Sequence, residues 1–307
     1  MPETEILVTP DSGEGLRLDV FLAGKSPGLT RSQIKKSIED GKVAVGGVVR
    51  RSSYKLRAGE TVVFAVEPPA PDRLEPQDIP LKIIHQDADV IVLDKPAGLV
   101  VHPGAGNRAG TLANALLHHF PEISGIGAWD RPGIVHRLDK QTSGIMVVAR
   151  SARAYESLLG QFKRRDVRKI YLGLAWGRIM AAEGRIDWPL GRHPKEGQKI
   201  SIRTRNPKSA ETFFRVLKTF ARTTFLEIRP TTGRTHQIRV HLAAAGYPIV
   251  GDPLYGTVKA AKNFPRLFLH AHILSFLHPA TGERLEFVSP LPDELDALLL
   301  AERNRRP

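Results

Sequence analysis

The N-terminal part of the chain shows two short amphipathic patterns followed by strand-like runs. In LRLDVFLAG, the spacing of Leu16, Val20 and Phe21 predicts one face of a helix. In TRSQIKKSIEDG, Ile34 and Ile38 predict the buried face of a second helix. KVAVGGVVR contains a glycine pair typical of a hairpin turn, and YKLRAGETVVFAV adds a further strand pattern. Together these patterns predict a small α+β unit.

The second of these helices has recognisable ends. Thr30 and Gln33 have the spacing of a capping box at its start, and Gly41 stands where the helix is expected to stop. Arg31 and Lys35 are four residues apart and therefore share a second face. The helix is expected to present an apolar face to its own unit and a cationic face to another molecule.

A proline-rich stretch separates this unit from the rest of the chain. Residues 67–80 contain five prolines, a composition typical of a stiff linker. The sequence therefore predicts an N-terminal segment at 1–15, a small unit at 16–66, the linker, and a large domain at 81–307.

The large domain alternates strand-like runs with polar loops. VIVLDKP, GIMVVA, KIYLGLAWG and TTFLEIRP have the pattern of strands, whereas TLANALLHHF, ARAYESLLGQFKRR and RTHQIRVHLAAAG have that of helices. In KIYLGLAWG the alternation places Tyr171 on the face opposite Leu172 and Leu174, so the tyrosine can point into a cleft. Strands outnumber helices and many loops are short, which predicts an α+β fold around a mixed, mainly antiparallel sheet.

The composition excludes several classes of protein. Hydrophobic residues make up 41% of the 307 residues, which is typical of a globular protein. The absence of cysteine excludes disulfides, a thiolate nucleophile and cysteine metal sites. The start MPETEILVTP lacks the apolar centre of a signal peptide, and no apolar run reaches the roughly 18 residues of a membrane span. The sequence therefore predicts a cytoplasmic protein with no membrane partner.

The positive charge is concentrated in two parts of the chain. The net charge is +13. Residues 25–57 hold nine lysines and arginines against two acids, and residues 163–205 hold twelve against four. Charge gathered in this way favours a polyanionic partner such as a nucleic acid. A basic but merely solvated surface is the simpler alternative.

Most common catalytic and cofactor motifs are absent. The loop VVHPGAGNRAGT lacks both the P-loop ending and the dinucleotide spacing. His236 and His241 are five residues apart, and no HExxH is present. His270 and His272 lack a carboxylate cluster, so the sequence predicts no metal site.

The segment HRLDKQTSG places a lone acid among cations. Asp139 lies between Arg137 and Lys140, with His136 just before them. A surface salt-bridge turn is the ordinary interpretation of such a triplet. Alternatively, an arginine keeps a carboxylate ionised, and an ionised carboxylate can act as a nucleophile or take a proton. The segment GRTHQIRVH could supply the guanidinium.

A pair of carboxylates acting on a glycosidic bond is a further possibility. It would need a second acid about 5–9 Å from Asp139. Asp94, Asp130, Glu227 and Asp252 each qualify by residue type. Nothing in the sequence selects one of them, so this hypothesis stays open.

Three segments resemble the signature motifs of the RluA-type RNA pseudouridine synthases. HRLDKQTSG resembles the first, HRLDxxTSG; RKIYLGLAWG resembles the second; PTTGRTHQIRVHLAAAGYPIVGDPLYG resembles the third. Residues 16–66 resemble an S4 RNA-binding domain. The stretch from LEPQDIP to TLANALLHHF is most similar to the RluD branch of the family. The resemblance covers the chain from about residue 10 to about residue 290.

The resemblance implies an isomerase acting on uridine in RNA. Such enzymes cut the N1–C1′ bond, turn the uracil and rejoin it through C5, without a cofactor or metal. By this resemblance Asp139 is the essential aspartate, Tyr171 packs on the target base and Arg239 pairs with the aspartate. Arg137 would take the place of the flipped nucleotide, and Gly144 would permit close packing. Whether the aspartate attacks C1′ or the uracil ring, or removes a proton to give a glycal, stays open.

The same resemblance implies the partner and the residues that contact it. The expected partner of this protein, a monomer, is large-subunit ribosomal RNA or a pre-ribosomal particle. The residues expected to contact RNA are Arg31, Lys35, Lys36 and Lys42 in the small unit and Arg234 and His236 in the large one. A sister enzyme with another ribosomal or transfer RNA target is one alternative. An RNA-binding assembly factor with a silent site is another, which the intact motifs disfavour.

Overall fold

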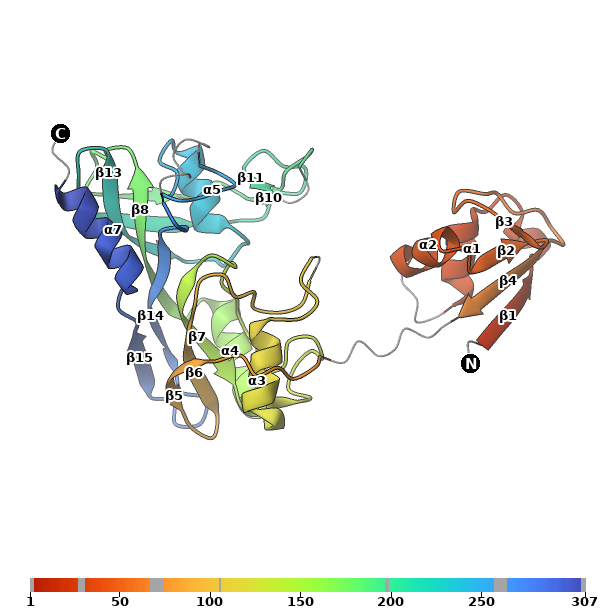
Figure 1. Cartoon of the computed structure of the whole chain (residues 1–307), viewed down its shortest axis with the longest axis horizontal. Helices are drawn as coiled ribbons and strands as arrows, with labels where there is room; N and C mark the ends of the chain where they lie inside the picture. The colour runs from red at the N-terminus through yellow and green to blue at the C-terminus, as the bar shows by residue number, and fades with distance from the viewer. Residues whose placement is uncertain are drawn as a thin grey trace. The chain divides into compact units, whose positions relative to one another are not determined.

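The protein folds into two compact units, Met1–Arg73 and Leu74–Pro307 (Figure 1). The computed structural model describes residues 3–26, 31–66, 74–104, 106–196, 199–256 and 264–304. The boundary between the units falls inside the proline-rich stretch, of which residues 67–73 lie outside the described part. Thr30, which the sequence predicts to cap a helix, lies outside it as well.

The first unit contains a four-stranded antiparallel sheet. Its strands, in the order in which they pair, are β1 (Glu3–Val8), β4 (Thr61–Val66), β2 (Val43–Val45) and β3 (Val48–Val49). The two glycines between β2 and β3 have φ angles of 56° and 76°, which suit the predicted hairpin turn. β1 pairs with β4 along its whole length, so part of the N-terminal segment belongs to this sheet.

Two helices, α1 (Leu18–Lys25) and α2 (Arg31–Glu39), pack in the core of this unit with residues of β2 and β4 and with Leu56. The predicted apolar face of α2 is confirmed, because Ile34 and Ile38 are buried. The chain turns after α2 at Gly41, whose φ of 74° suits glycine. A short 3₁₀ helix, η1, precedes α1 at Asp11–Gly13.

The predicted face of α1 is correct for Phe21, which is buried, and wrong for Leu16 and Val20. Leu16 and Val20 are 40% and 38% exposed. Leu18 and Leu22 are buried together with Phe21. The reason is that α1 begins at Leu18, so the i, i+3, i+4 series that faces the core starts there rather than at Leu16.

The second unit is built on a nine-stranded sheet. Along its main path lie β5 (Lys82–Gln86), β6 (Val90–Lys95), β7 (Ser143–Ala149), β14 (Leu269–Leu277), β8 (Arg168–Trp176), β13 (Thr223–Pro230), β12 (Thr212–Thr219) and β9 (Glu183–Ile186), and β15 (Arg284–Val288) pairs with β14. Among these strand pairs only β7 with β14 is parallel. The predicted α+β fold around a mixed, mainly antiparallel sheet is confirmed.

Helices cover both faces of the sheet at β6 and β7. α3 (Leu112–His119) packs in one core cluster with Ile91, and α4 (Ala152–Arg164) packs in another with Val92. Adjacent residues of a strand point to opposite faces, which explains why Val90–Leu93 and Ile145–Ala149 are apolar and buried without interruption. The other helices of this unit within the described residues are η2 (Pro121–Ile123), α5 (Gln237–Ala244) and α7 (Asp293–Asn304). Within the described ranges, no helix has the length and apolarity needed to cross a lipid bilayer.

The described end of the predicted linker packs on the second unit. The Asn114 amide donates to the Glu75 carbonyl at 2.8 Å, and Gln77 accepts the Gly110 N–H at 2.7 Å. Residues 74–80 are therefore held by hydrogen bonds to α3 and to the residues just before it.

Helix α5 begins later than the pattern predicts, at Gln237. His236 has a left-handed backbone conformation, with φ of 54°. A right-handed α-helix requires a negative φ, so His236 cannot be part of the helix. The Gln237 side chain accepts the Arg234 N–H at 3.0 Å and donates to the Glu211 carbonyl at 2.8 Å. Arg234 and His236 consequently lie on a loop in front of the helix.

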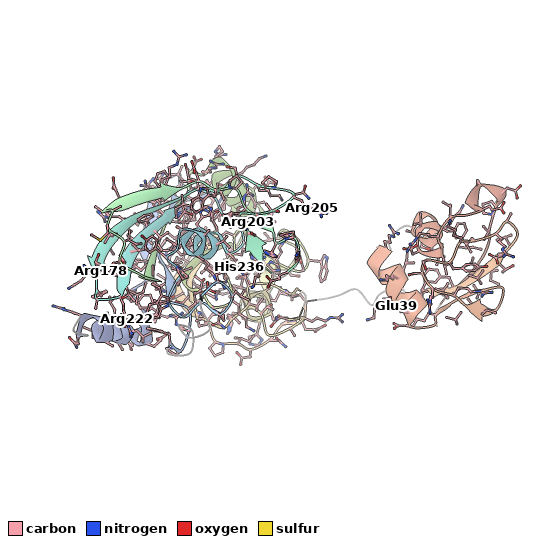
Figure 2. The ribbon with its side chains drawn as sticks, turned by 90° about the horizontal axis from the view of Figure 1, so that it is seen from above. Glu39, Arg178, Arg203, Arg205, Arg222 and His236 are labelled. Atoms are coloured by element: carbon pink, nitrogen blue, oxygen red, sulfur yellow. The ribbon has the colours of Figure 1, made fainter. Side chains whose placement is uncertain are left out.

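A separate two-stranded hairpin, β10 (Gly191–Arg192) with β11 (Ile200–Ser201), completes the second unit. Figure 2 shows Arg203 and Arg205 on the segment that follows β11. In the same view Arg178 and Arg222 lie toward the other side of this unit.

Candidate active site

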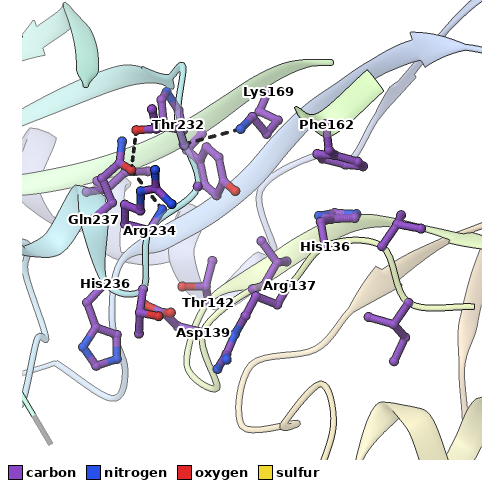
Figure 3. A pocket seen from close by; sticks show the side chains of 18 of the residues that line it. His136, Arg137, Asp139, Thr142, Phe162, Lys169, Thr232, Arg234, His236 and Gln237 are labelled. Carbon is purple, nitrogen blue, oxygen red and sulfur yellow. Dashed lines mark hydrogen bonds between the residues drawn. The ribbon is translucent and has the colours of Figure 1, made fainter. Parts of the chain in front are cut away.

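The second unit contains a cavity of about 710 Å³ between the loop before β7, the strand β8 and the loop before α5. Six of the predicted site residues line it: Arg137, Asp139, Tyr171, Arg234, His236 and Arg239. Figure 3 shows Asp139 between Arg137 and His236. The remaining four, Arg31, Lys35, Lys36 and Lys42, belong to the first unit.

A buried arginine holds the Asp139 carboxylate. Arg239 donates through Nη1 to Asp139 Oδ2 at 3.1 Å. The Arg239 side chain is only 5% exposed and that of Asp139 is 16% exposed. Because water is largely excluded from this pair, its mutual attraction is screened much less than that of a surface ion pair.

The same arginine is fixed from behind by Asp252. Its Nε and Nη2 each donate to Asp252 at 2.8 Å, a forked pair that sets the plane of the guanidinium. Asp252 also accepts the backbone N–H groups of Leu254 and Tyr255. Burial alone would raise the pKa of Asp252, but the hydrogen bonds and charge of Arg239 lower it below its usual range. Asp252 is therefore an ionised anchor for Arg239.

The sequence named Asp252 only as one of four acids that could act beside Asp139. Asp94 pairs with Lys82 at 3.0 Å and Glu227 with Arg215 at 3.0 Å. None of the four lines the cavity, so Asp139 is the sole carboxylate among the described residues that form its wall. These positions give no support to a second carboxylate acting on substrate.

Tyr171 lies on β8, where it pairs with Ile228 of β13 and Ala271 of β14. Its ring packs against apolar core residues while its side chain also lines the cavity. Burial and the nearby charge of Asp139 raise the pKa of the Tyr171 hydroxyl, so the side chain is neutral. It presents an uncharged aromatic surface beside the carboxylate.

His236 is held at the rim of the cavity by Tyr255. Its Nδ1 lies 2.8 Å from the Tyr255 hydroxyl, which also accepts the Ile200 N–H at 2.9 Å. The Arg239 guanidinium carbon lies 5.2 Å from the centre of the Tyr255 ring. Burial lowers the pKa of His236, which favours the neutral ring. Tyr255, which the sequence did not single out, thus links the two predicted residues.

The other cations of the cavity differ in how they are held. Arg137 and Arg234 are exposed at the rim, and Arg234 Nε donates to the Ser209 carbonyl at 3.1 Å. Lys169 was not predicted; its Nζ lies 3.5 Å from the Thr232 carbonyl (Figure 3). Burial lowers the pKa of Lys169 to about 8. Lys169 and Tyr171 are two residues apart in β8, so they point to the same face of the sheet and both line the cavity. The alternation along this strand could therefore have predicted Lys169 from the sequence.

His136 is a structural residue rather than one more cation beside Asp139. Its Nε2 accepts the Val147 N–H at 3.0 Å, and its ring stacks on Phe162 with 4.6 Å between ring centres. Burial lowers the pKa of His136 to about 3, so the ring is neutral at pH 7. His136 holds residues 135–142, the loop that carries Asp139 (the Asp139 loop), against β7.

Lys95 ties the same loop to β6. Its Nζ donates to the carbonyls of Pro96, Leu99 and Lys140 at 2.8, 2.9 and 3.3 Å. The residue is completely buried, and burial lowers the pKa of its ammonium to about 7. The sequence showed only a lysine at the end of a strand, because the Lys140 acceptor lies on a loop that is distant in the sequence.

The buried histidines outside the cavity use their rings for internal hydrogen bonds. His241 contacts Thr212 Oγ1 and the Trp188 carbonyl at 2.9 and 2.8 Å. His270 contacts Ser143 Oγ and the Ser289 carbonyl at 2.9 and 3.1 Å. Among the described residues, no three histidine, aspartate or glutamate side chains come together as a metal site would need.

In the first unit the predicted cations lie on or just after α2. Arg31 donates to the buried Asp19 at 2.8 Å, and the hydrogen bond from Arg17 is the main cause that lowers the pKa of Asp19 to about 2. Lys35 lies 3.7 Å from Glu39. Lys36 and Lys42 are exposed. Arg31 therefore ties α2 to α1 as well as facing solvent.

Comparison with protein families shows to which class the chain belongs. Residues 89–244 match the family described as RNA pseudouridylate synthase, and residues 16–62 match the S4 domain. The chain belongs to the RNA pseudouridine synthase family and is therefore an isomerase that carries an S4 domain. The resemblance inferred from the three motifs is confirmed.

Individual relatives extend the likeness over nearly the whole chain. The chain is 44% identical to ribosomal large subunit pseudouridine synthase D of Xanthomonas campestris over 308 residues, covering 96% of this chain and 92% of that protein. It is 42% identical over 314 residues to an uncharacterized RNA pseudouridine synthase of Synechocystis, covering 100% and 96%. Among solved structures, human RNA pseudouridylate synthase domain containing 1 has a TM-score of 0.58 at 30% identity, covering 75% of this chain and 97% of that one.

Proposed function

We propose that this enzyme converts uridine to pseudouridine in large-subunit ribosomal RNA, with Asp139 as the essential group and without a cofactor. The observation that carries the proposal is that one carboxylate, alone among the described residues that line the cavity, pairs with a buried arginine that a second aspartate holds in place. The RNA target is supported by relatives named ribosomal large subunit pseudouridine synthase D in Xanthomonas campestris, Nitrosomonas europaea and Pseudomonas aeruginosa.

The reaction requires that the target uridine leave its stack. The glycosidic bond of a stacked base is out of reach, and flipping the nucleotide costs roughly a few kcal/mol. A loop uridine is already partly unstacked and needs less. Tyr171 provides a neutral aromatic surface for the uracil. Arg137, exposed at the rim, fills the space that the flipped nucleotide leaves.

Asp139 then acts at the junction of sugar and base. The N1–C1′ bond breaks, the uracil turns within the cavity, and C1′ joins C5. The C5 hydrogen leaves as a proton and N1 gains one, so no oxidant or reductant is needed. Arg239 pairs with the carboxylate and orients it for this step. The Asp139 carboxylate supplies the reactive oxygen in each route that the resemblance left open.

Release of C5 tritium from defined RNAs tests the proposed substrate. Large-subunit ribosomal RNA labelled at uridine C5 should lose tritium when incubated with the enzyme, in proportion to the pseudouridine formed. Labelled small-subunit and transfer RNA should retain it. Pseudouridine mapping in a strain that lacks the gene should show that sites in large-subunit RNA are no longer modified, and the intact gene should restore them. Sites missing only from transfer RNA would refute the assigned substrate.

A further inference from the structure

A second hollow lies beside the candidate active site, at the β10–β11 hairpin. Its volume is about 570 Å³. The loop residues Gly233, Arg234 and Thr235 line both this hollow and the catalytic cavity. The two spaces are therefore separated only by the short segment in front of α5.

The walls of this second hollow are positively charged. Its ionisable lining residues are Arg192, His193, Arg205, Lys208 and Arg234. No acidic side chain occurs among the described residues that form its wall. A surface merely kept soluble by charge usually mixes both signs, whereas a concave wall of one sign concentrates the potential that attracts an oppositely charged ligand.

The hollow is shaped by packing rather than by a loose loop. Gly191 leaves no room for a Cβ, which would collide with Thr204 Oγ1 and lie 2.7 Å from the Asn206 carbonyl oxygen. The backbones of Leu190 and Lys208 exchange two hydrogen bonds of 2.9 Å. The segment 204–208 is thus held against the start of the hairpin, with Arg205 and Lys208 exposed.

Hydrogen bonds also fix the hollow relative to the catalytic residues. The Ile200 N–H of β11 donates to the Tyr255 hydroxyl at 2.9 Å, and that hydroxyl lies 2.8 Å from His236 Nδ1. Arg234 Nε reaches the Ser209 carbonyl at 3.1 Å. A ligand bound in the second hollow would consequently lie at a set position from Asp139.

We infer that this second hollow binds the phosphodiester backbone of the RNA strand immediately beside the flipped uridine. The inference rests on the proposed function, because it assumes a nucleotide in the catalytic cavity. A strand that leaves that cavity across Gly233–Thr235 carries a phosphate at every nucleotide into the basic hollow. Arginine and lysine contacts to phosphate set the register of a strand without reading its sequence. The hollow therefore positions the target rather than selecting it by base identity.

The test compares two double variants of equal charge. R205Q/K208Q removes two exposed cations from the hollow, and R178Q/R222Q removes two exposed cations from the other side of the same unit (Figure 2). KM and kcat are measured by C5 tritium release, and the RNA dissociation constant is measured at several salt concentrations. Thermal unfolding confirms that each variant is folded.

R205Q/K208Q should raise KM about tenfold while kcat stays near that of the wild type, because a phosphate contact is made equally in ground and transition states. The slope of log affinity against log salt should fall by about 0.7 for each phosphate that the variant no longer neutralises. R178Q/R222Q should change KM and this slope far less. If both double variants change them equally, the hollow is not the binding site.

The inference and the proposed function fail in different ways. A wild-type protein that releases tritium from no RNA removes the proposed function itself. If the wild type is active but the R205Q/K208Q variant has an unchanged KM and salt slope, only the proposed phosphate-binding site is refuted.

Discussion

The Arg239 side chain faces two carboxylates that differ in exposure, and the difference assigns them different work. Asp252 is fully buried and takes two guanidinium nitrogens, whereas Asp139 takes one and is 16% exposed toward the cavity. Breaking a buried ion pair by removing one partner costs about 3–5 kcal/mol. Because Asp252 is fully buried and holds Arg239 through two hydrogen bonds, we assign it the role of positioning Arg239. Asp139 is the carboxylate of the pair that is exposed to the cavity.

At the same scale, His136 makes stability depend on pH. Its folded pKa is about 3 against an ordinary value of 6.5, so between these pH values the unfolded chain binds a proton that the folded protein does not. The free energy of unfolding should therefore fall as pH drops from 6.5 toward 3, by at most about 1.4 kcal/mol per pH unit from this residue.

Urea unfolding of the wild type and of His136→Gln at several pH values measures this contribution. His241 and His270 also have lowered pKa values and contribute to the wild-type slope, so the difference between the two proteins is the relevant quantity. The variant should lose less stability per pH unit between pH 6.5 and 5. Parallel curves would show that His136 is protonated in the folded protein.

At the scale of elements, the parallel contact of β7 with β14 carries the Asp139 loop. It consists of the pairs Ser143 with His270 and Gly144 with Ala271. Gly144 has φ of 116°, and a Cβ there would collide with the Ala271 backbone. The close packing that the family resemblance implies for this glycine is therefore a contact between the backbones of two strands.

Gly144→Ala should separate these strands at the base of the Asp139 loop. Overpacking and the unfavourable φ together should lower the free energy of unfolding by about 2–4 kcal/mol and reduce kcat. Gly282→Ala is the matched control, because Gly282 also has a positive φ of 73° but has open space around its Cβ position. Equal urea midpoints for the two variants would contradict the strand contact.

How far the sequence predicted these elements depended on the range of the contacts involved. The face of α2 followed from Ile34 and Ile38, whose spacing is local. For α1 only Phe21 followed, because the pattern does not say that the helix starts at Leu18. The start of α5 was missed because His236 adopts a left-handed backbone, which no pattern of apolar residues reveals.

The same limit applies to the candidate site. The motifs pointed to Asp139, Tyr171 and Arg239, and the structure places all three at one cavity. They did not reveal that Asp252 anchors Arg239 or that Lys95 binds three loop carbonyls. Those contacts depend on which distant segments the fold brings together, and residue type alone does not determine that.

At the scale of the whole molecule, positive charge is divided between two separately folded units. The first unit carries cations on and after α2, and the second has lysines and arginines in the walls of the Asp139 cavity and of the hollow beside it. Contacts to phosphate add affinity without reading sequence, so each unit can contribute to binding a structured RNA. Only the second unit holds the carboxylate, and the chemistry is accordingly assigned to that unit.

The most direct test of the central claim is tritium release from C5-labelled large-subunit RNA by Asp139→Asn, which keeps the shape of the side chain and removes its charge. Release should fall at least about a thousandfold, as when the essential group of an active site is removed. RNA affinity should stay within a few fold of the wild type. Asp94→Asn, outside the cavity, should release tritium at the wild-type rate. Release by Asp139→Asn at the wild-type rate would contradict the account.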